Sequence, residues 1–203
     1  DFYDVFETKE KHIALVIADV ADKGMPAALY MTVTRTLIRA IAQEISSPAK
    51  ILERVNELLE SESQNGMFVT AFFGLLNPDN DIITYANAGH NLPLIIRQEK
   101  HRIEHLQKDG IALGVIDNAT YRDKQITLKP GDSLLIYTDG VTESFSIEGE
   151  IFNESRLKNL LLELPHDSAT DLLTSILKRL EGFRNGEPPS DDLTMIAIHR
   201  NMQ

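Results

Sequence analysis

The sequence lacks cysteine altogether, and this absence removes several kinds of chemistry. Disulfide bonds, zinc sites with thiolate ligands and cysteine nucleophiles are excluded, and the absence is compatible with a reducing compartment. Long hydrophobic runs are missing as well. No run approaches the roughly 20 apolar residues that a membrane-spanning helix needs, and there is no signal-peptide pattern. We therefore expect no membrane contact by this part of the chain.

Positive charge is also scarce. The chain has 20 Lys and Arg residues against 31 Asp and Glu residues, for a formal net charge of -11. Proteins that bind a nucleic-acid backbone cluster basic residues, and no such cluster occurs here. This balance argues against a nucleic-acid partner. It is compatible with cation binding, although most acidic proteins simply have acidic surfaces.

The residues that are present suffice for a hydrophobic core. Of 203 residues, 42% are hydrophobic and 25% are charged, which fits one globular domain or at most two small ones. We expect a single domain over residues 1–203. Because the first residue is Asp1 and not Met, we also expect this domain to be the C-terminal part of a longer regulatory protein.

Hydrophobic periodicity predicts an α+β fold. Alternating or continuous apolar segments predict strands at 2–6, 12–18, 67–76, 81–87, 92–96, 102–106, 124–128, 133–138 and 193–199. Apolar residues at helical spacing predict helices at 26–45, 48–62, 154–163 and 168–183. In the first of these helices, the repeat consists of Leu29, Val33, Leu37 and Ile41. Strands and helices come in runs rather than in strict alternation, which favours antiparallel sheets with helices beside them.

Aspartates stand at the ends of four predicted strands. Asp19 ends an apolar run, Asp139 ends another, Asp191 precedes the last strand and Asp1 precedes the first. If the first hairpin turns near residues 9–10, facing residue numbers sum to about 19 or 20, which places Asp1 beside Ala18 or Asp19. Antiparallel pairing of the last two strands, which we assume, would likewise bring Asp139 and Asp191 to one end.

Carboxylates gathered in this way repel one another and stay ionised only beside a compensating cation. Hard oxygen ligands without His or Cys favour Mg²⁺ or Mn²⁺ over zinc, and two such ions about 4 Å apart can activate a water for attack at phosphorus. Simpler interpretations stay open. Asp139-Gly140 is also a turn dipeptide, Asp191-Asp192 could be a solvated loop, and Asp22 is expected to be a turn or cap residue.

Five motifs in one order carry a family resemblance. They are DFYD, ADVADKGMPAAL, NAGHNLP, KPGDSLLIYTDGVTES and SDDLTMIAI. The sequence resembles the bacterial SpoIIE/RsbU-type branch of the PP2C-like, metal-dependent serine/threonine phosphatases, the PPM class. The resemblance implies a PP2C-like antiparallel β-sandwich flanked by pairs of α-helices. It implies hydrolysis of phosphoserine or phosphothreonine on a protein, by direct attack of metal-activated water.

The resemblance also implies the ligands of two Mn²⁺ or Mg²⁺ ions. Asp19 would bridge both ions, Asp1 would complete one shell, and Asp139 and Asp191 would complete the other, with the carbonyl of Val20 as a further ligand. The catalytic set is then Asp19, Asp139 and Asp191. The glycines that precede the first motif in the family are absent from this chain, so Asp1 is the least secure ligand.

The implied partners follow the same resemblance. The substrate would be a phosphorylated anti-anti-sigma protein of the STAS type, and a sensor or regulatory domain would lie upstream. A homodimer is compatible with this picture, and so is a cytoplasmic location, including the cytoplasmic part of a membrane-anchored sensor. In this family the first helix pair is linked to regulation, and we expect Arg35 and Arg39 on its outer face.

Other residues have competing roles. His90 could donate a proton to the leaving oxygen, but we favour a turn residue that hydrogen-bonds backbone. Glu143 and Asp192 are candidates for the shell behind the ligands, and Lys23 is a weak candidate for binding phosphate. Thr138 and Thr194 are expected to serve strand and turn geometry.

The main rival hypothesis is a non-catalytic PP2C-like module that signals by binding; retention of all four acids argues against it. A two-metal cyclase or nuclease would need a different order of elements and, for nucleic acid, a basic surface.

Overall fold

The structure is a computed structural model that describes residues 1–62, 66–164 and 167–202. Contacts between Cα atoms divide the chain into two compact units. Unit 1 consists of Asp1–His90 and Gln107–Thr127, and unit 2 consists of Asn91–Leu106 and Leu128–Gln203. Each unit contains one antiparallel sheet and one pair of long helices. The expected two antiparallel sheets with helix pairs beside them are therefore confirmed.

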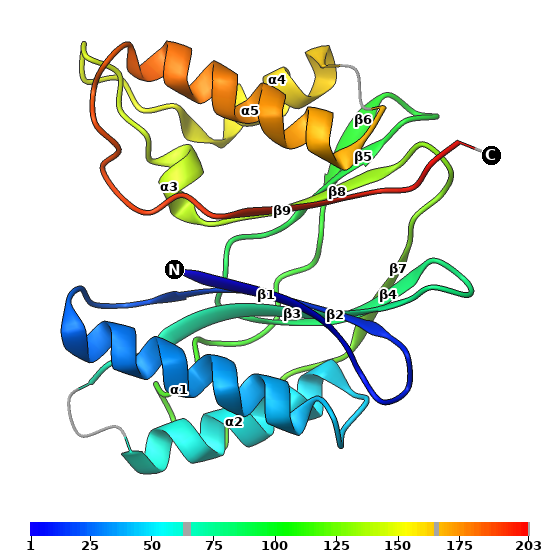
Figure 1. Ribbon diagram of the computed structural model, residues 1–203, viewed down its shortest axis with the longest axis vertical. Helices are drawn as coiled ribbons and strands as arrows, with labels where there is room; N and C mark the ends of the chain where they lie inside the picture. Colours follow the sequence, from blue (N-terminus) through cyan, green and yellow to red (C-terminus); the bar gives the residue numbers. More distant parts are fainter. Residues whose placement is uncertain (63–65, 165–166, 203) are drawn as a thin grey trace. The chain divides into compact units, whose positions relative to one another are not determined.

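Unit 1 is built on a five-stranded sheet in the order β1-β2-β3-β4-β7. The strands are β1 (Phe2–Glu7), β2 (Ile13–Val20), β3 (Val69–Asn77), β4 (Ile82–Ala88) and β7 (Lys124–Thr127). The two helices α1 (Met25–Ile41) and α2 (Pro48–Glu62) cover one face of this sheet (Figure 1). Strand β2 lies between β1 and β3, and its residues from Ala14 to Ala18 are all buried.

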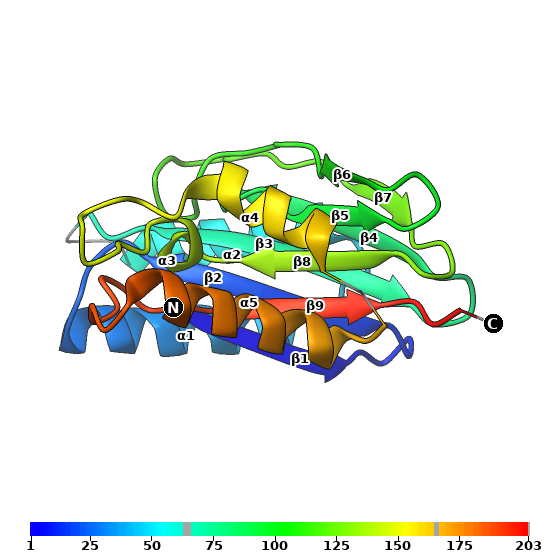
Figure 2. The same cartoon turned by 90° about the horizontal axis from the view of Figure 1, so that it is seen from above.

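Unit 2 is built on a four-stranded sheet in the order β6-β5-β8-β9. The strands are β5 (Leu94–Arg97), β6 (Arg102–His105), β8 (Ser133–Tyr137) and β9 (Met195–His199). The helices α4 (Asn153–Glu163) and α5 (Ala169–Arg184) lie over one face of this sheet (Figure 2), and one short helix, α3 (Asp139–Thr142), follows β8. No helix in the described ranges of either unit is long and apolar enough to cross a membrane.

Every predicted strand and helix is found, with two differences. The first helix ends at Ile41 and not near residue 45, because the chain tightens there: the amides of Gln43 and Glu44 bond to carbonyls three residues back, at Ala40 and Ile41. The second difference is α3, which no periodicity indicated because a single turn is too short to show one.

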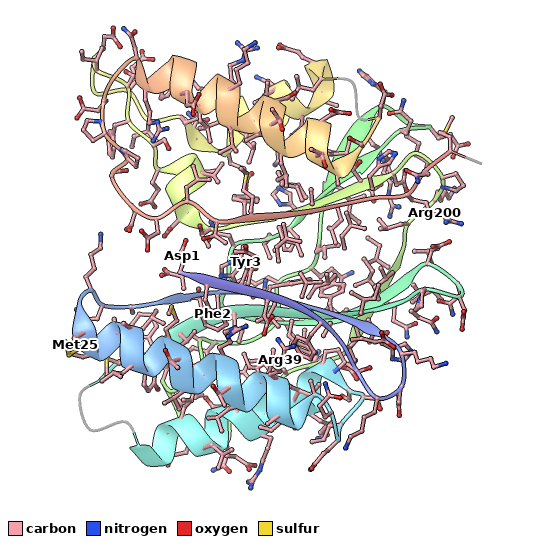
Figure 3. All side chains as sticks on the ribbon, viewed as in Figure 1. Asp1, Phe2, Tyr3, Met25, Arg39 and Arg200 are labelled. Atoms are coloured by element: carbon pink, nitrogen blue, oxygen red, sulfur yellow. The ribbon has the colours of Figure 1, made fainter. Side chains whose placement is uncertain are left out.

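The apolar repeat that predicted α1 does not form its buried face. Leu29 and Val33 are 64% and 48% exposed, and Met25, at the tip of the helix in Figure 3, is 77% exposed. The residues of α1 that are buried are Ala27, Tyr30, Thr34 and Ile38. An apolar stripe of Met25, Leu29 and Val33 therefore lies on the surface of unit 1, which we call the α1 stripe.

One buried acid ties α1 to the edge strand β1. Asp4 is 7% exposed and accepts hydrogen bonds from Arg39 Nη1 to both carboxylate oxygens, at 2.9 and 2.8 Å. Arg35 Nε lies 3.2 Å from the same carboxylate, and the Arg39 guanidinium stacks 4.6 Å from the centroid of the Phe6 ring. Figure 3 shows Arg39 on the side of α1 that faces β1. Both arginines are about half exposed, so the expected outer face holds only in part: their charged ends bind Asp4.

We expect Asp4→Ala to lower the free energy of unfolding by about 1–3 kcal/mol, since it removes charge-assisted hydrogen bonds from a largely buried group. Urea denaturation of the purified protein measures this loss. The matched control is Glu57→Ala, which breaks an exposed ion pair with Arg54 on α2 and should cost less than about 0.5 kcal/mol. Equal losses in the two variants would show that Asp4 does not anchor α1.

Candidate functional site

The first pair of predicted ligands lies at one end of the β1–β2 hairpin. Strands β1 and β2 pair with Phe2 opposite Ala18, so that facing residue numbers sum to 20, one of the two expected registers. Asp1 and Asp19 follow directly at this end, and Figure 3 shows Asp1 where β1 begins. Asp19 also pairs with Thr70 on β3. Asp19 therefore stands at the end of a buried central strand, where it is itself half-buried.

The turn after Asp19 leads directly into α1. The carbonyl of Val20 accepts the Asp22 amide at 2.8 Å, and a carboxylate oxygen of Asp22 accepts the Lys23 amide, also at 2.8 Å. Asp22 thus acts as a turn residue, as expected. The Val20 carbonyl has a second lone pair that could still bind a cation. Gly24, with φ of 87°, then begins the helix from the left-handed region that glycine tolerates.

Asp139 begins the one-turn helix α3. Its main-chain carbonyl accepts the Glu143 amide at 2.7 Å and the Thr142 hydroxyl at 3.2 Å. The Asp139-Gly140 dipeptide thus opens a helical turn, and the side chain of Asp139 is half-buried.

The assumed pairing of the last strands is confirmed. β8 and β9 are antiparallel neighbours, with Tyr137 opposite Met195. The Thr138 amide continues the ladder by donating to the Thr194 carbonyl at 3.1 Å. Asp139 and the Asp191-Asp192 segment consequently emerge at the same end of this strand pair. Asp191 and Asp192 are both exposed, and a carboxylate oxygen of Asp191 accepts the Asp192 amide at 2.8 Å.

The start of α3 and the segment before β9 are in close contact. A Cβ atom placed on Gly140 would overlap the carbonyl oxygen of Asp192, so this position has no room for a side chain. One turn later, the Ser190 hydroxyl donates to the carbonyl of Glu143 at 3.1 Å. Glu143 and Asp192, which were expected behind the ligands, therefore make these contacts through their main chains.

Tyr137, the last residue of β8, supports this end of the strand from below. Burial raises the pKa of the Tyr137 phenol, and the charge of Glu154 adds to the effect. The phenol accordingly stays protonated near neutral pH, where it donates to Glu154 Oε2 at 3.4 Å.

His90 is a well-bonded residue of unit 1. It is 5% exposed; its amide donates to Asn87 Oδ1 at 2.8 Å, and its carbonyl accepts Asn87 Nδ2 at 3.1 Å. Its ring Nδ1 lies 3.0 Å from the hydroxyl of Thr70, the residue opposite Asp19 in the sheet. These bonds fit the turn role that we favoured. The sequence analysis did not single out Asn87 or Thr70, although an Asn three residues before a buried His in a turn was the available signal.

The predicted metal ligands are divided between the units. Asp1, Asp19 and Val20 belong to unit 1, whereas Asp139 and Asp191 belong to unit 2. Within the residues that the structure describes, no group of three or more His, Cys, Asp or Glu side chains could by itself hold a metal ion. The donors in each unit are carboxylate and carbonyl oxygens, which fit Mg²⁺ or Mn²⁺ and not a soft metal. The two-ion centre stays a prediction.

Comparison with known proteins then defines the class of protein. The family model described as Stage II sporulation protein E (SpoIIE) matches residues 9–201, a range that spans both units. The chain therefore belongs to the SpoIIE family. Its fold is that of PP2C domains: the SiaA-PP2C domain of Pseudomonas aeruginosa superposes with a TM-score of 0.84 at 19% identity, over 98% of this chain and 79% of that one.

Two curated relatives stand out by identity. Protein IcfG of Synechocystis is 33% identical, over 99% of this chain and 36% of the relative. Phosphoserine phosphatase RsbU of Bacillus subtilis is 30% identical, over 100% of this chain and 59% of the relative. The chain thus spans between about a third and three fifths of the length of these relatives.

The contact between Gly140 and Asp192 can be tested with a pair of glycine variants. Gly140→Ala forces a side chain against backbone, and we expect it to lower the free energy of unfolding by about 1–3 kcal/mol. In Gly182→Ala, within α5, the new Cβ meets nothing within 4 Å. That variant should raise the free energy of unfolding by about 0.5–1 kcal/mol, as alanine does in helices. Denaturant unfolding of both variants decides; a harmless Gly140→Ala would contradict the close packing.

Proposed function

We propose that this chain is a metal-dependent protein phosphatase that hydrolyses phosphoserine or phosphothreonine on a regulatory protein. One observation carries the proposal: two antiparallel strand pairs, β1–β2 and β8–β9, each end on aspartates at positions that match the family motifs. The relatives named phosphoserine phosphatase, RsbU and RsbP of Bacillus subtilis, align over 100% and 98% of this chain. Residues 1–203 would act as one phosphatase domain.

The proposed cofactors are two Mn²⁺ or Mg²⁺ ions. Asp19 would bridge them, Asp1 would complete one shell, Asp139 and Asp191 would complete the other, and the Val20 carbonyl would add a ligand. When bound, such ions supply an activated water and neutralise phosphate charge. The chain's own contribution is to hold these oxygens in place against their mutual repulsion. Lys23, exposed in the turn after Asp19, is a further candidate for contacting phosphate.

The proposed substrate is a phosphorylated STAS-type anti-anti-sigma protein, as the resemblance to the SpoIIE/RsbU branch implies. The proposed setting is a cytoplasmic regulatory protein whose sensor domain lies upstream. The rival hypothesis, a module that only binds, gains no support from the site residues because all the predicted acidic ligands are present.

The catalytic proposal predicts a metal-dependent loss in Asp139→Asn. Phosphate release from a phosphoserine peptide, measured with and without Mn²⁺, should fall at least about 100-fold, the upper end of the losses seen when even supporting groups of a metal site are removed. Circular dichroism should show an intact fold. The matched control is Asp79→Asn in the exposed β3–β4 turn, which should keep the wild-type rate. Wild-type activity in Asp139→Asn would sink the proposal.

We further propose that the α1 stripe is the surface through which regulation reaches the domain, because an exposed apolar row on a helix invites a partner. Leu29→Ser combined with Val33→Ser should leave the rate of residues 1–203 unchanged, since neither residue is near the predicted ligands in sequence. In the full-length protein, the same pair should abolish the difference between stimulated and unstimulated rates. A full response in the double variant would exclude the stripe from regulation.

A further inference from the structure

Thr138 occupies a capping position without capping. It is the N-cap residue of α3, where a threonine hydroxyl ordinarily accepts an amide of the first helical turn. Its side chain makes no such bond. The hydroxyl instead accepts the Thr194 amide at 3.1 Å and lies 3.5 Å from the Thr194 carbonyl, to which it can donate. Thr138 is completely buried, at 0% exposure.

These bonds are the first of three contacts that join the segment after β8 to the segment before β9. Thr138 meets Thr194, Gly140 fits against the carbonyl of Asp192, and the carbonyl of Glu143 accepts the Ser190 hydroxyl. Figure 1 shows α3 beside the chain that enters β9. Both segments belong to unit 2, so their arrangement is internal to one compact unit.

The segment that is held in this way has little else to order it. Residues 185 to 192 are all exposed and contain no helix or strand, and two prolines and two glutamate or aspartate pairs are not needed to see that the chain there is solvated. Asp191 lies at the end of this exposed stretch. Asp139, by contrast, is fixed by the hydrogen bonds of α3. The position of Asp191 relative to Asp139 therefore depends on the contacts that fasten this loop.

We propose that Thr138 is a positioning residue for metal binding: its hydroxyl, with Ser190 further along, fixes the spacing between Asp139 and Asp191. This inference rests on the proposed function. Two carboxylates at one end of a strand pair repel each other, and a loop free to move would separate them. A clamp made before the metal arrives removes part of that cost, so that affinity depends on a side chain that touches no ion.

The experiment compares Mn²⁺ affinity in Thr138→Val and Thr138→Ser, measured by electron paramagnetic resonance of free Mn²⁺ during titration of the purified protein. Valine keeps the shape of threonine but loses the hydroxyl, and we expect the dissociation constant to rise by about 10-fold or more. Serine keeps the hydroxyl and should restore an affinity near that of the wild type. The control is Thr84→Val, which removes a strand hydroxyl that accepts Gln125 Nε2 in unit 1 and should not change affinity.

A second measurement separates local positioning from general destabilisation. Without Mn²⁺, the amides of residues 190–194 should exchange hydrogen faster in Thr138→Val than in the wild type, while the amides of β8 stay equally protected. If Thr138→Val does not fold, Ser190→Ala replaces it, because it loosens the same loop from an exposed position; a smaller but measurable loss of Mn²⁺ affinity is then expected.

The outcomes are distinct. Unchanged Mn²⁺ affinity in Thr138→Val, or in Ser190→Ala where that variant takes its place, overturns the inference and leaves the proposed function standing. Equal losses in the valine and serine variants also overturn it, because the hydroxyl would then not be the cause. Wild-type protein whose Mn²⁺ binding is insensitive to Asp139→Asn overturns the proposed function and this inference together.

Discussion

Strand register is the constraint on which the candidate site depends. Side chains alternate between the two faces of a sheet, so a slip of one residue between β1 and β2 would exchange every inward position for an outward one. The register that places Phe2 opposite Ala18 is the register that brings Asp1 and Asp19 to one end. Burial enforces it: Phe2 and Phe6 point into the core of unit 1, and β2 is buried on both sides. The acids are thus held by apolar residues that carry no chemistry themselves.

The same logic operates in unit 2 by different means. Strands β8 and β9 pair over five residues, and the pairing ends where the acids begin. Beyond Tyr137 the ladder is continued by side-chain and main-chain contacts of Thr138, and the absence of a side chain at Gly140 admits the neighbouring backbone. Regular hydrogen bonding therefore brings the two segments together, and particular residues determine how closely they approach at the end.

Much of this arrangement was predictable from the sequence. Alternation in residues 2–7 and the polar turn after them were enough for the β1–β2 hairpin and its register, because both signals are local. The acids were recognisable by their place after apolar runs. The diversion of the Thr138 hydroxyl was not predictable, since an N-cap threonine looks the same in sequence whatever it bonds. Periodicity also misled for α1: Leu29 and Val33 mark a helix correctly, but which stripe is buried depends on partners such as Asp4 on β1, which are distant in the sequence.

The exposed row of Met25, Leu29 and Val33 also bears on how the protein behaves in concentrated solution. An apolar row favours contact between copies, whereas a formal net charge of -11 keeps copies apart. Added salt screens the repulsion over distances of about 10 Å at 0.1 M and leaves the hydrophobic attraction intact. Ionic strength is therefore expected to govern the colloidal state of the purified chain, with dilute salt favouring dispersed molecules. Met25, the most exposed member of the row, is in addition open to oxidation, which would make the row more polar.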